Sequence, residues 1–283
     1  MKKLFLFLSL ILVLILALTA CFYPDGSEGL AYEENWDGKS CTITGIGTCT
    51  DTDIVIPATI DGMKVTGIKE KAFYNCDKIT SIMLPKNITS ISDKAFDDCD
   101  SLTSISIPNS VTSIGLGAFA SCNSLTSINI PNSVTSIGPA AFGYCTSLTS
   151  INIPNSVTSI GEETFSGCTS LTSITFGKNS HLTSIGEKAF SGCTSLTSIT
   201  FPDSLTIIDK CAFIDCANLT SITLGKSSQP LSIGRWAFYS TDLETINFKG
   251  TKAQWNLITK GDGWNFYTPG IIVYCADGTV AGY

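Results

Sequence analysis

A segment of 23 residues repeats along most of this chain, and the repeat limits the fold more than any other feature. The copy SLTSISIPNSVTSIGLGAFASCN occupies residues 101–123 and is followed directly by the next copy. Consecutive copies are marked by Phe73, Phe96, Phe119, Phe142, Phe165, Phe190, Phe213 and Phe238, which are separated by five intervals of 23 residues and two of 25. A fixed period in the twenties is typical of solenoids. The chain is therefore predicted to form one repeat array.

Within each repeat the residue pattern predicts short extended pieces separated by turns. Ile105 and Ile107 alternate with serines, which is the period of a half-buried strand. Pro108 cannot donate to a strand ladder, so it ends this strand. Residues 111–115 (VTSIG) predict a second short extended piece, and residues 116–122 (LGAFASC) suit one helical or 3₁₀ turn that buries the alanine and the phenylalanine.

One repeat cannot bury its own apolar side, but stacked repeats can. Paired strands lie about 4.7–4.9 Å apart, so copies stacked at this distance form a continuous core. The predicted fold is a β-rich, right-handed solenoid. It has a parallel sheet on one face and short strand or helical turns on the other.

The same residues carry a resemblance to a known family. Over about residues 40–250 the pattern LxxIxIPxxVxxIGxxAFxxC resembles the leucine-rich repeat of BspA-like surface proteins, also described from treponemes. Its proline stands where other leucine-rich repeats continue toward an asparagine. The resemblance implies a leucine-rich repeat array with an adhesin-like role, and its partner would be an extracellular protein or glycan.

The first 20 residues predict export. Lys2 and Lys3 precede an apolar run over residues 4–18, which is typical of a secretory signal peptide. Residues 18–21 (LTAC) are similar to the lipobox of bacterial lipoproteins, which implies that Cys21 becomes a lipidated N-terminus. An ordinary signal peptide with an incidental cysteine is the alternative. Phe22 replaces the aspartate that retains some lipoproteins at the inner membrane, so a lipid-anchored place at the bacterial cell surface or outer membrane is expected.

The rest of the chain divides into four predicted parts. Residues 21–38 are the lipidated N-terminus and a tether, and residues 39–68 are an N-terminal cap with an irregular first repeat, in which Asp61-Gly62 marks a tight turn. Residues 69–248 form the solenoid, and residues 249–283 form a C-terminal cap. Five aromatic residues concentrate in that cap, where they plug the core or form a platform for a glycan or protein: Trp255, Trp264, Phe266, Tyr267 and Tyr274.

Charge excludes some partners. The chain has 17 basic and 24 acidic residues, and removal of Lys2 and Lys3 with a signal peptide leaves 15 against 24. A protein this acidic repels phosphate groups, so neither nucleic acid nor an anionic lipid surface is expected as a partner. The expected membrane contact is the lipid anchor alone.

Seven of the twelve cysteines lie three residues after a repeat phenylalanine: Cys76, Cys99, Cys122, Cys145, Cys168, Cys193 and Cys216. Stacking places them in one column with side chains pointing the same way, which is poor geometry for disulfides. A buried thiol ladder is predicted; a metal column is the alternative, although no CxxC pair or partner histidine supports it. Cys41 and Cys49 lie eight residues apart in an exported cap, where a disulfide between them and two free thiols are equally open alternatives. Cys211 and Cys275 have no predicted role.

No residue pattern predicts catalysis. The single histidine, His181, lies in one of two loops created by two-residue insertions, at residues 177–182 and 225–231, and is expected to be exposed. No nucleophile-elbow or phosphate-binding-loop motif stands out in the sequence. The acidic pairs Asp97-Asp98 and Glu162-Glu163 fall on turn segments of different repeats, where solvated charge is expected. We therefore expect no catalytic residue, no cofactor and no metal.

The outward positions of the predicted strands form the candidate ligand-binding face. They are Ser104, Ser106, Ser127, Asn129, Ser150, Asn152, Ser173, Thr175, Ser198, Thr200, Ser221 and Thr223. Extended solenoid faces commonly bind partners, and many weak sites gain strength in multiple copies. Two alternatives remain: these residues solvate the strands of a spacer or cell-envelope component without a ligand, or a regular hydroxyl lattice binds ice.

Overall fold

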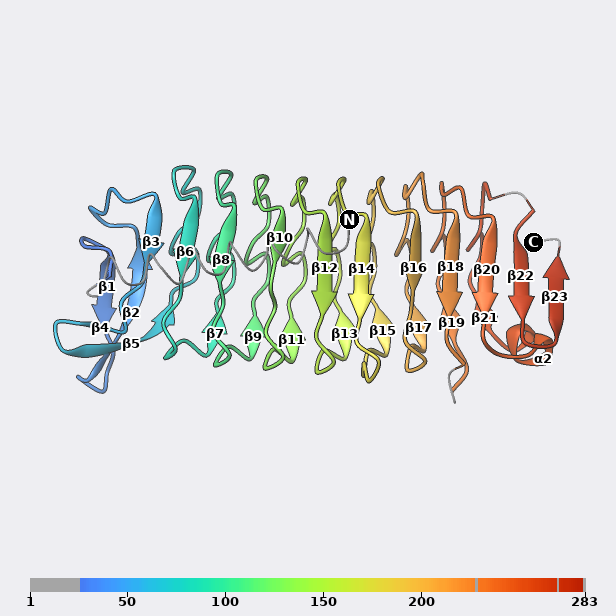
Figure 1. The fold of residues 1–283 in the computed structure, drawn as a ribbon, viewed down its shortest axis with the longest axis horizontal. Helices are drawn as coiled ribbons and strands as arrows, with labels where there is room; N and C mark the ends of the chain where they lie inside the picture. Colours follow the sequence, from blue (N-terminus) through green and yellow to red (C-terminus); the bar gives the residue numbers. More distant parts are fainter. Residues whose placement is uncertain (1–25, 227–228, 269, 282–283) are drawn as a thin grey trace, which may run out of the picture.

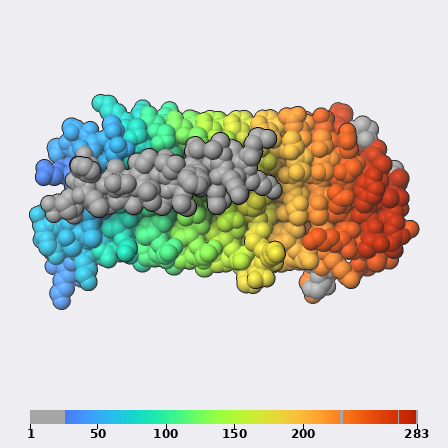
Figure 2. Space-filling model, in the orientation of Figure 1, coloured from blue at the N-terminus to red at the C-terminus, as the bar shows by residue number. Residues whose placement is uncertain are grey.

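The computed structural model describes residues 26–226, 229–268 and 270–281. The predicted signal peptide and Cys21 lie outside the described residues. The chain winds into a long solenoid in which sequence order is also spatial order, from blue to red in Figure 1. Figure 2 shows the solenoid as one continuous rod. The predicted fold class is confirmed. In the described ranges no helix has the length and apolar character to cross a membrane.

The first strand of each repeat forms one parallel row along the rod. Its members pair with the same repeat position in the next coil, as Ser127 does with Ser150 and Ser198 with Ser221. They fall into three consecutive hydrogen-bonded sheets, the last of which includes β23. The strands of the row are β3 (Asp53–Val55), β6 (Ser81–Met83), β8 (Ser104–Ser106), β10 (Ser127–Ile128), β12 (Ser150–Ile153), β14 (Ser173–Phe176), β16 (Ser198–Thr200), β18 (Ser221–Leu224), β20 (Thr245–Phe248) and β22 (Ile272–Cys275).

The second extended piece of each repeat forms another parallel row, visible below the first in Figure 1. A Cβ on Gly138 would lie 2.6 Å from the backbone carbon of Gly115, so the residue after most of these strands is glycine because adjacent coils approach closely there; Ser92 and Asp209 are the exceptions. The strands are β7 (Ser90–Ile91), β9 (Ser113–Ile114), β11 (Ser136–Ile137), β13 (Ser159–Ile160), β15 (Ser184–Ile185), β17 (Ile207–Ile208), β19 (Ser232–Ile233) and β21 (Thr259–Lys260).

The segment between the second strand and the next repeat differs from its prediction. Residues 116–121 form a run of turns, because Gly117 and Ser121 both have φ of +56° and interrupt any helix. Alternate amides point along the rod, so that Phe119 N donates to the carbonyl of Ala141 in the next coil at 2.8 Å. A helical turn would direct these amides within its own segment and would lose the bonds between coils. The predicted burial of Ala118 and Phe119 is confirmed.

Stacked phenylalanines form the centre of the core. Neighbouring rings from Phe73 to Phe238 are 5.1–5.5 Å apart between centroids and nearly parallel, with interplanar angles of 3–13°. All eight rings are fully buried. One aromatic column therefore runs through the solenoid.

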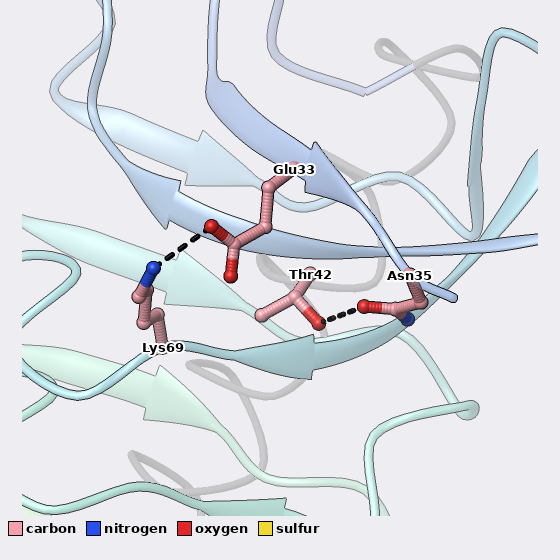
Figure 3. Close-up of polar contacts among 4 residues, drawn as sticks. All are labelled: Glu33, Asn35, Thr42 and Lys69. Atoms are coloured by element: carbon pink, nitrogen blue, oxygen red, sulfur yellow. Dashed lines mark hydrogen bonds and ion pairs between the residues drawn. The ribbon is translucent and has the colours of Figure 1, made fainter.

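The N-terminal cap begins earlier than the sequence predicts. Ser27 and Leu30 are buried, and β1 (Ala31–Glu34) pairs antiparallel with β2 (Ser40–Gly45), so part of the expected tether is folded. Lys69 Nζ contacts Glu33 at 2.8 Å, and Thr42 Oγ1 donates to Asn35 Oδ1 at 2.9 Å (Figure 3). A short acidic strand among glycines has little hydrophobic signal, and its sequence therefore predicts a tether instead.

A second hairpin completes this cap. Strands β4 (Thr59–Ile60) and β5 (Met63–Ile68) pair antiparallel, and the sheet has the order β1-β2-β5-β4. Asp61 and Gly62 at the turn both have positive φ, at +49° and +80°, which confirms the predicted tight turn. The antiparallel strands cover the end of the parallel rows.

At the other end, one degenerate coil precedes the closing hairpin. β21 and β22 continue the two rows beyond residue 248, so the repeat pattern extends into the predicted cap. The short helix α2 (Lys252–Asn256) starts at a capping box made by Thr251 and Gln254, and β23 (Gly278–Ala281) pairs antiparallel with β22. The helix contributes the fully buried Trp255 to the core.

Candidate binding surfaces

The twelve residues of the predicted ligand-binding face, here called the strand face, lie in or directly after the strands of the first row. Ser104, Ser106, Ser221 and Thr223 are half-buried, and the other eight are exposed. The strands run in register, so Asn152 lies opposite Thr175 and Thr200 opposite Thr223. Thr175 Oγ1 donates to Asn152 Oδ1 at 3.0 Å. The strand face is thus a regular array of small neutral side chains. Among its twelve residues, one side-chain hydrogen bond, from Thr175 to Asn152, links neighbouring coils.

Two ladders of threonines border the strand rows, and sequence reasoning did not single them out. In one, Thr103 Oγ1 donates to the carbonyl of Thr80 at 2.9 Å; in the other, Thr135 Oγ1 donates to the carbonyl of Thr112 at 3.2 Å. The recurrent Thr-Ser before each strand was the available signal. The hydroxyl groups of these threonines donate to the backbone, so both ladders hold neighbouring coils together.

The cysteine column lies inside the rod. Cys145 Sγ donates to the carbonyl of Phe119 at 3.0 Å, and the thiols from Cys99 to Cys216 repeat this contact. Burial raises the pKa of Cys99, Cys168 and Cys216 to about 12. Such thiols stay protonated and inert at neutral pH. The column is therefore structural in character.

Within the described residues, the cysteines outside the column are also free thiols. Cys41 is buried and Cys49 half-buried, and the disulfide considered for this pair is not formed in the structure. Cys211 is buried, and Cys275 is half-buried in β22. Across the described ranges no group of three or more His, Cys, Asp or Glu side chains is arranged to hold a metal.

The first inserted loop lies beside a polar cleft. His181 is exposed, and its amide donates to the carbonyl of Asn155 at 3.2 Å. The cleft is lined by Lys178, Asp203 and Lys249 among others, and Lys249 forms an ion pair with Asp203 at 2.9 Å. This pair neutralises most of the local charge. No arrangement of these residues places a nucleophile beside a base.

The aromatic residues of the C-terminal region separate into a buried and an exposed set. Trp255 and Trp264 are 0% and 6% exposed and close the core, as expected of a cap. Phe266 and Tyr267 are 52% and 68% exposed. These two contact Tyr239, and Tyr239 contacts Trp236, on the turn segments of adjacent coils. We call Trp236, Tyr239, Phe266 and Tyr267 the aromatic patch; Tyr274 is exposed on β22 apart from it.

Sequence reasoning missed the aromatic patch, although its signal was present. It grouped aromatic residues by their nearness in sequence rather than by their place in the repeat. Tyr239 directly follows Phe238, and Phe266 occupies the same repeat position one coil later. Alignment by repeat register would have brought the four residues together.

Comparisons with known proteins agree with this architecture. The model of the BspA type leucine rich repeat region matches residues 48–148 and 135–256, with 6 copies. A leucine-rich repeat protein from Bacteroides ovatus is 30% identical over 83% of this chain and 66% of its own, with a TM-score of 0.67. The Treponema pallidum leucine rich repeat protein is 28% identical over 75% and 86% of the two chains, with a TM-score of 0.54.

A leucine-rich repeat protein from Eubacterium ventriosum is 26% identical over 67% of this chain, with a TM-score of 0.56. This chain spans about two thirds of the Bacteroides protein and 59% of the Eubacterium protein. A search among curated proteins finds no match. The matched repeats cover well over half of the sequence, and the chain belongs to the family of BspA-type leucine-rich repeat proteins, which are non-catalytic repeat scaffolds.

Proposed function

We propose that this protein is a surface-anchored scaffold that binds macromolecules of a host or of neighbouring cells and performs no catalysis. The observation that carries the proposal is the long array of coils with outward residues in register. Such an array repeats one weak contact many times, and many copies on one cell raise the overall affinity further. An extracellular protein or a glycan is the proposed partner.

The anchor is the second part of the proposal. We expect export through residues 1–20 and lipid attachment at Cys21, because LTAC at residues 18–21 is similar to a lipobox. Two or three acyl chains hold a protein on a membrane far more firmly than one. Cys21→Ala should abolish incorporation of labelled fatty acid and release the protein from the cell. Unchanged labelling in the variant would refute the anchor at this residue.

The adhesion test compares the purified protein with two sets of variants on arrays of extracellular-matrix proteins and glycans. One set exchanges the strand-face serines, asparagines and threonines among themselves. The matched control exchanges outward residues of the second row, such as Ser113 and Ser136. Binding that is lost only in the first set supports recognition by the strand face, and no binding by the unaltered protein contradicts adhesion.

A spacer without a ligand is the alternative, and one observation favours it. The threonine ladders and the Asn152–Thr175 bond use polar side chains to hold coils together, which a spacer requires. The strand face also lacks Trp, Tyr and Arg, the residues that dominate most protein hot spots. A spacer should tolerate every exchange on that face without loss of the cellular phenotype.

A further inference from the structure

We propose that the aromatic patch is a hot spot for a partner protein, and that it binds a segment in which Lys or Arg side chains alternate with apolar ones. The inference rests on the proposed function, because it names the class of partner and the part of the scaffold that recognises it. It places recognition on the turn segments at the C-terminal end of the rod rather than on the strand face.

The four rings hold one another in place. Phe266 and Tyr267 are 4.7 Å apart between centroids and perpendicular, and Tyr239 meets Tyr267 edge-on at 5.4 Å. Tyr239 also lies parallel to Phe266 at 6.3 Å, and Trp236 is 6.2 Å from Tyr239. Rings fixed in this way lose little freedom when a partner binds, which is the usual advantage of Tyr and Trp in binding surfaces.

The aromatic patch exposes apolar surface to water, which is unfavourable unless a partner covers it. Trp236, Phe266 and Tyr267 are 38%, 52% and 68% exposed and lie side by side on two coils. Elsewhere on the turn segments, exposed large apolar residues such as Leu116 and Tyr144 stand on separate coils. A contiguous group of exposed apolar side chains marks an interaction site more often than scattered ones do. Trp, Tyr and Arg are also the residues enriched in hot spots.

The charges around the aromatic patch favour a basic partner. Arg235 lies over the Trp236 ring, 3.8 Å from its centroid, so this ring already holds one guanidinium group, and a basic side chain of the partner would stack on the other rings. Asp215, Asp242 and Asp262 are exposed, and in the described part of the chain none of them forms an ion pair. Asp242 lies three residues after Tyr239, and Asp262 lies four residues before Phe266. The amide of Asp215 donates to the carbonyl of Tyr239 at 3.0 Å, which places the backbone of Asp215 beside the patch.

The net charge of −7 adds long-range attraction for a basic segment. Charge complementarity of this kind raises the association rate and excludes acidic competitors. A neutral partner would gain nothing from the three unpaired carboxylates. The exposed rings and the unpaired carboxylates therefore both favour a partner segment with apolar and basic side chains.

The test titrates the purified full chain with short amphipathic peptides that alternate leucine with lysine, with serine or with glutamate, by calorimetry. The lysine peptide should bind at least about tenfold more tightly than the others. Its affinity should fall by about thirtyfold in F266S/Y267S, the loss expected of a hot spot. Tyr144→Ser is the matched control, because Tyr144 is 59% exposed on a distant turn, and it should change affinity less than about twofold.

Two results would overturn the inference. Equal binding of the lysine peptide to the unaltered protein and to F266S/Y267S would mean diffuse attraction by net charge. If the lysine peptide does not bind, a basic amphipathic segment is not the ligand of the patch. This holds whether or not a neutral oligosaccharide such as cellohexaose binds there instead. Either result leaves the adhesion proposal standing if the matrix and glycan arrays still bind the protein, whereas failure on those arrays alone refutes adhesion.

Discussion

The strand face and the turn segments of this solenoid follow opposite rules. From β8 to β18 the outward positions on the strands hold only Ser, Thr or Asn, as in the column Ser127, Ser150 and Ser173. The second position after each short strand of the second row varies along the rod, and its residues include Leu116, Pro139, Glu162, Glu187, Lys210 and Arg235. The strand face therefore repeats similar residues from coil to coil, whereas the residues of the turn segments differ between coils.

Stacking in register explains the difference. An outward strand residue lies directly beside its equivalent in the next coil, so a repeated charge would meet itself at strand spacing and destabilise the sheet. Small neutral residues avoid this cost. On the turns, two ion pairs join adjacent coils: Lys188 contacts Glu163 at 3.6 Å, and Lys210 contacts Glu187 at 2.9 Å. Uniform positions therefore serve stability, and variable positions are free to serve recognition.

The largest expected effect comes from the core below the turns. Phe142 is fully buried between Phe119 and Phe165, each 5.5 Å away between centroids. Phe142→Ala should lower the free energy of unfolding by about 3–5 kcal/mol, because the truncation leaves a cavity. Tyr144→Ala, two residues later on the exposed side, should change it by less than about 0.5 kcal/mol. Chemical denaturation measures both, and similar losses would refute the division between inside and outside.

The thiol ladder predicts sensitivity to alkali. Burial raises the pKa of Cys168 from 9.0 to about 12, so its contribution to stability is complete below the unfolded pKa and is lost as pH rises toward the folded one. Unfolding free energy should fall by about 1.4 kcal/mol per pH unit for this thiol above pH 9. Cys168→Ala should show a correspondingly shallower slope in denaturation at a series of pH values. An unchanged slope would mean that the thiol is not protected from solvent.

A smaller effect is expected where the turns use left-handed backbone. Gly117 has φ of +56°, and the equivalent Ala140 has φ of +50°. A Cβ added to Gly117 would meet nothing closer than the Lys94 side chain at 3.5 Å, so only the backbone conformation opposes it. Gly117→Ala should cost about 1 kcal/mol, measured by thermal unfolding. A loss several times larger would indicate a steric clash that the structure does not contain.

Sequence analysis predicted the features that recur from repeat to repeat and missed those that occur in a single coil. Four features recur in many repeats, so the period alone is enough to predict them. They are the strand, the proline that ends it, the buried phenylalanine and the cysteine of the thiol column. The turn backbone was mispredicted, because amides that bond the next coil leave no local signal. β1 and the aromatic patch were missed because each occurs once and depends on contacts between residues far apart in the pattern.

The smallest expected effect tests the uniform surface itself. Ser150 and Asn152 are exposed on β12, and only Asn152 has a side-chain bond, to Thr175. Ser150→Ala should change the unfolding free energy by less than about 0.5 kcal/mol, and Asn152→Ala should cost about 0.5–1 kcal/mol through that bond. Lysine at three successive positions of the column, Ser127, Ser150 and Ser173, should destabilise far more than three alanines, and added salt should reverse much of the loss. If three lysines were tolerated as well as three alanines, in-register repulsion would not explain the uniform face, and its composition would have to reflect a ligand.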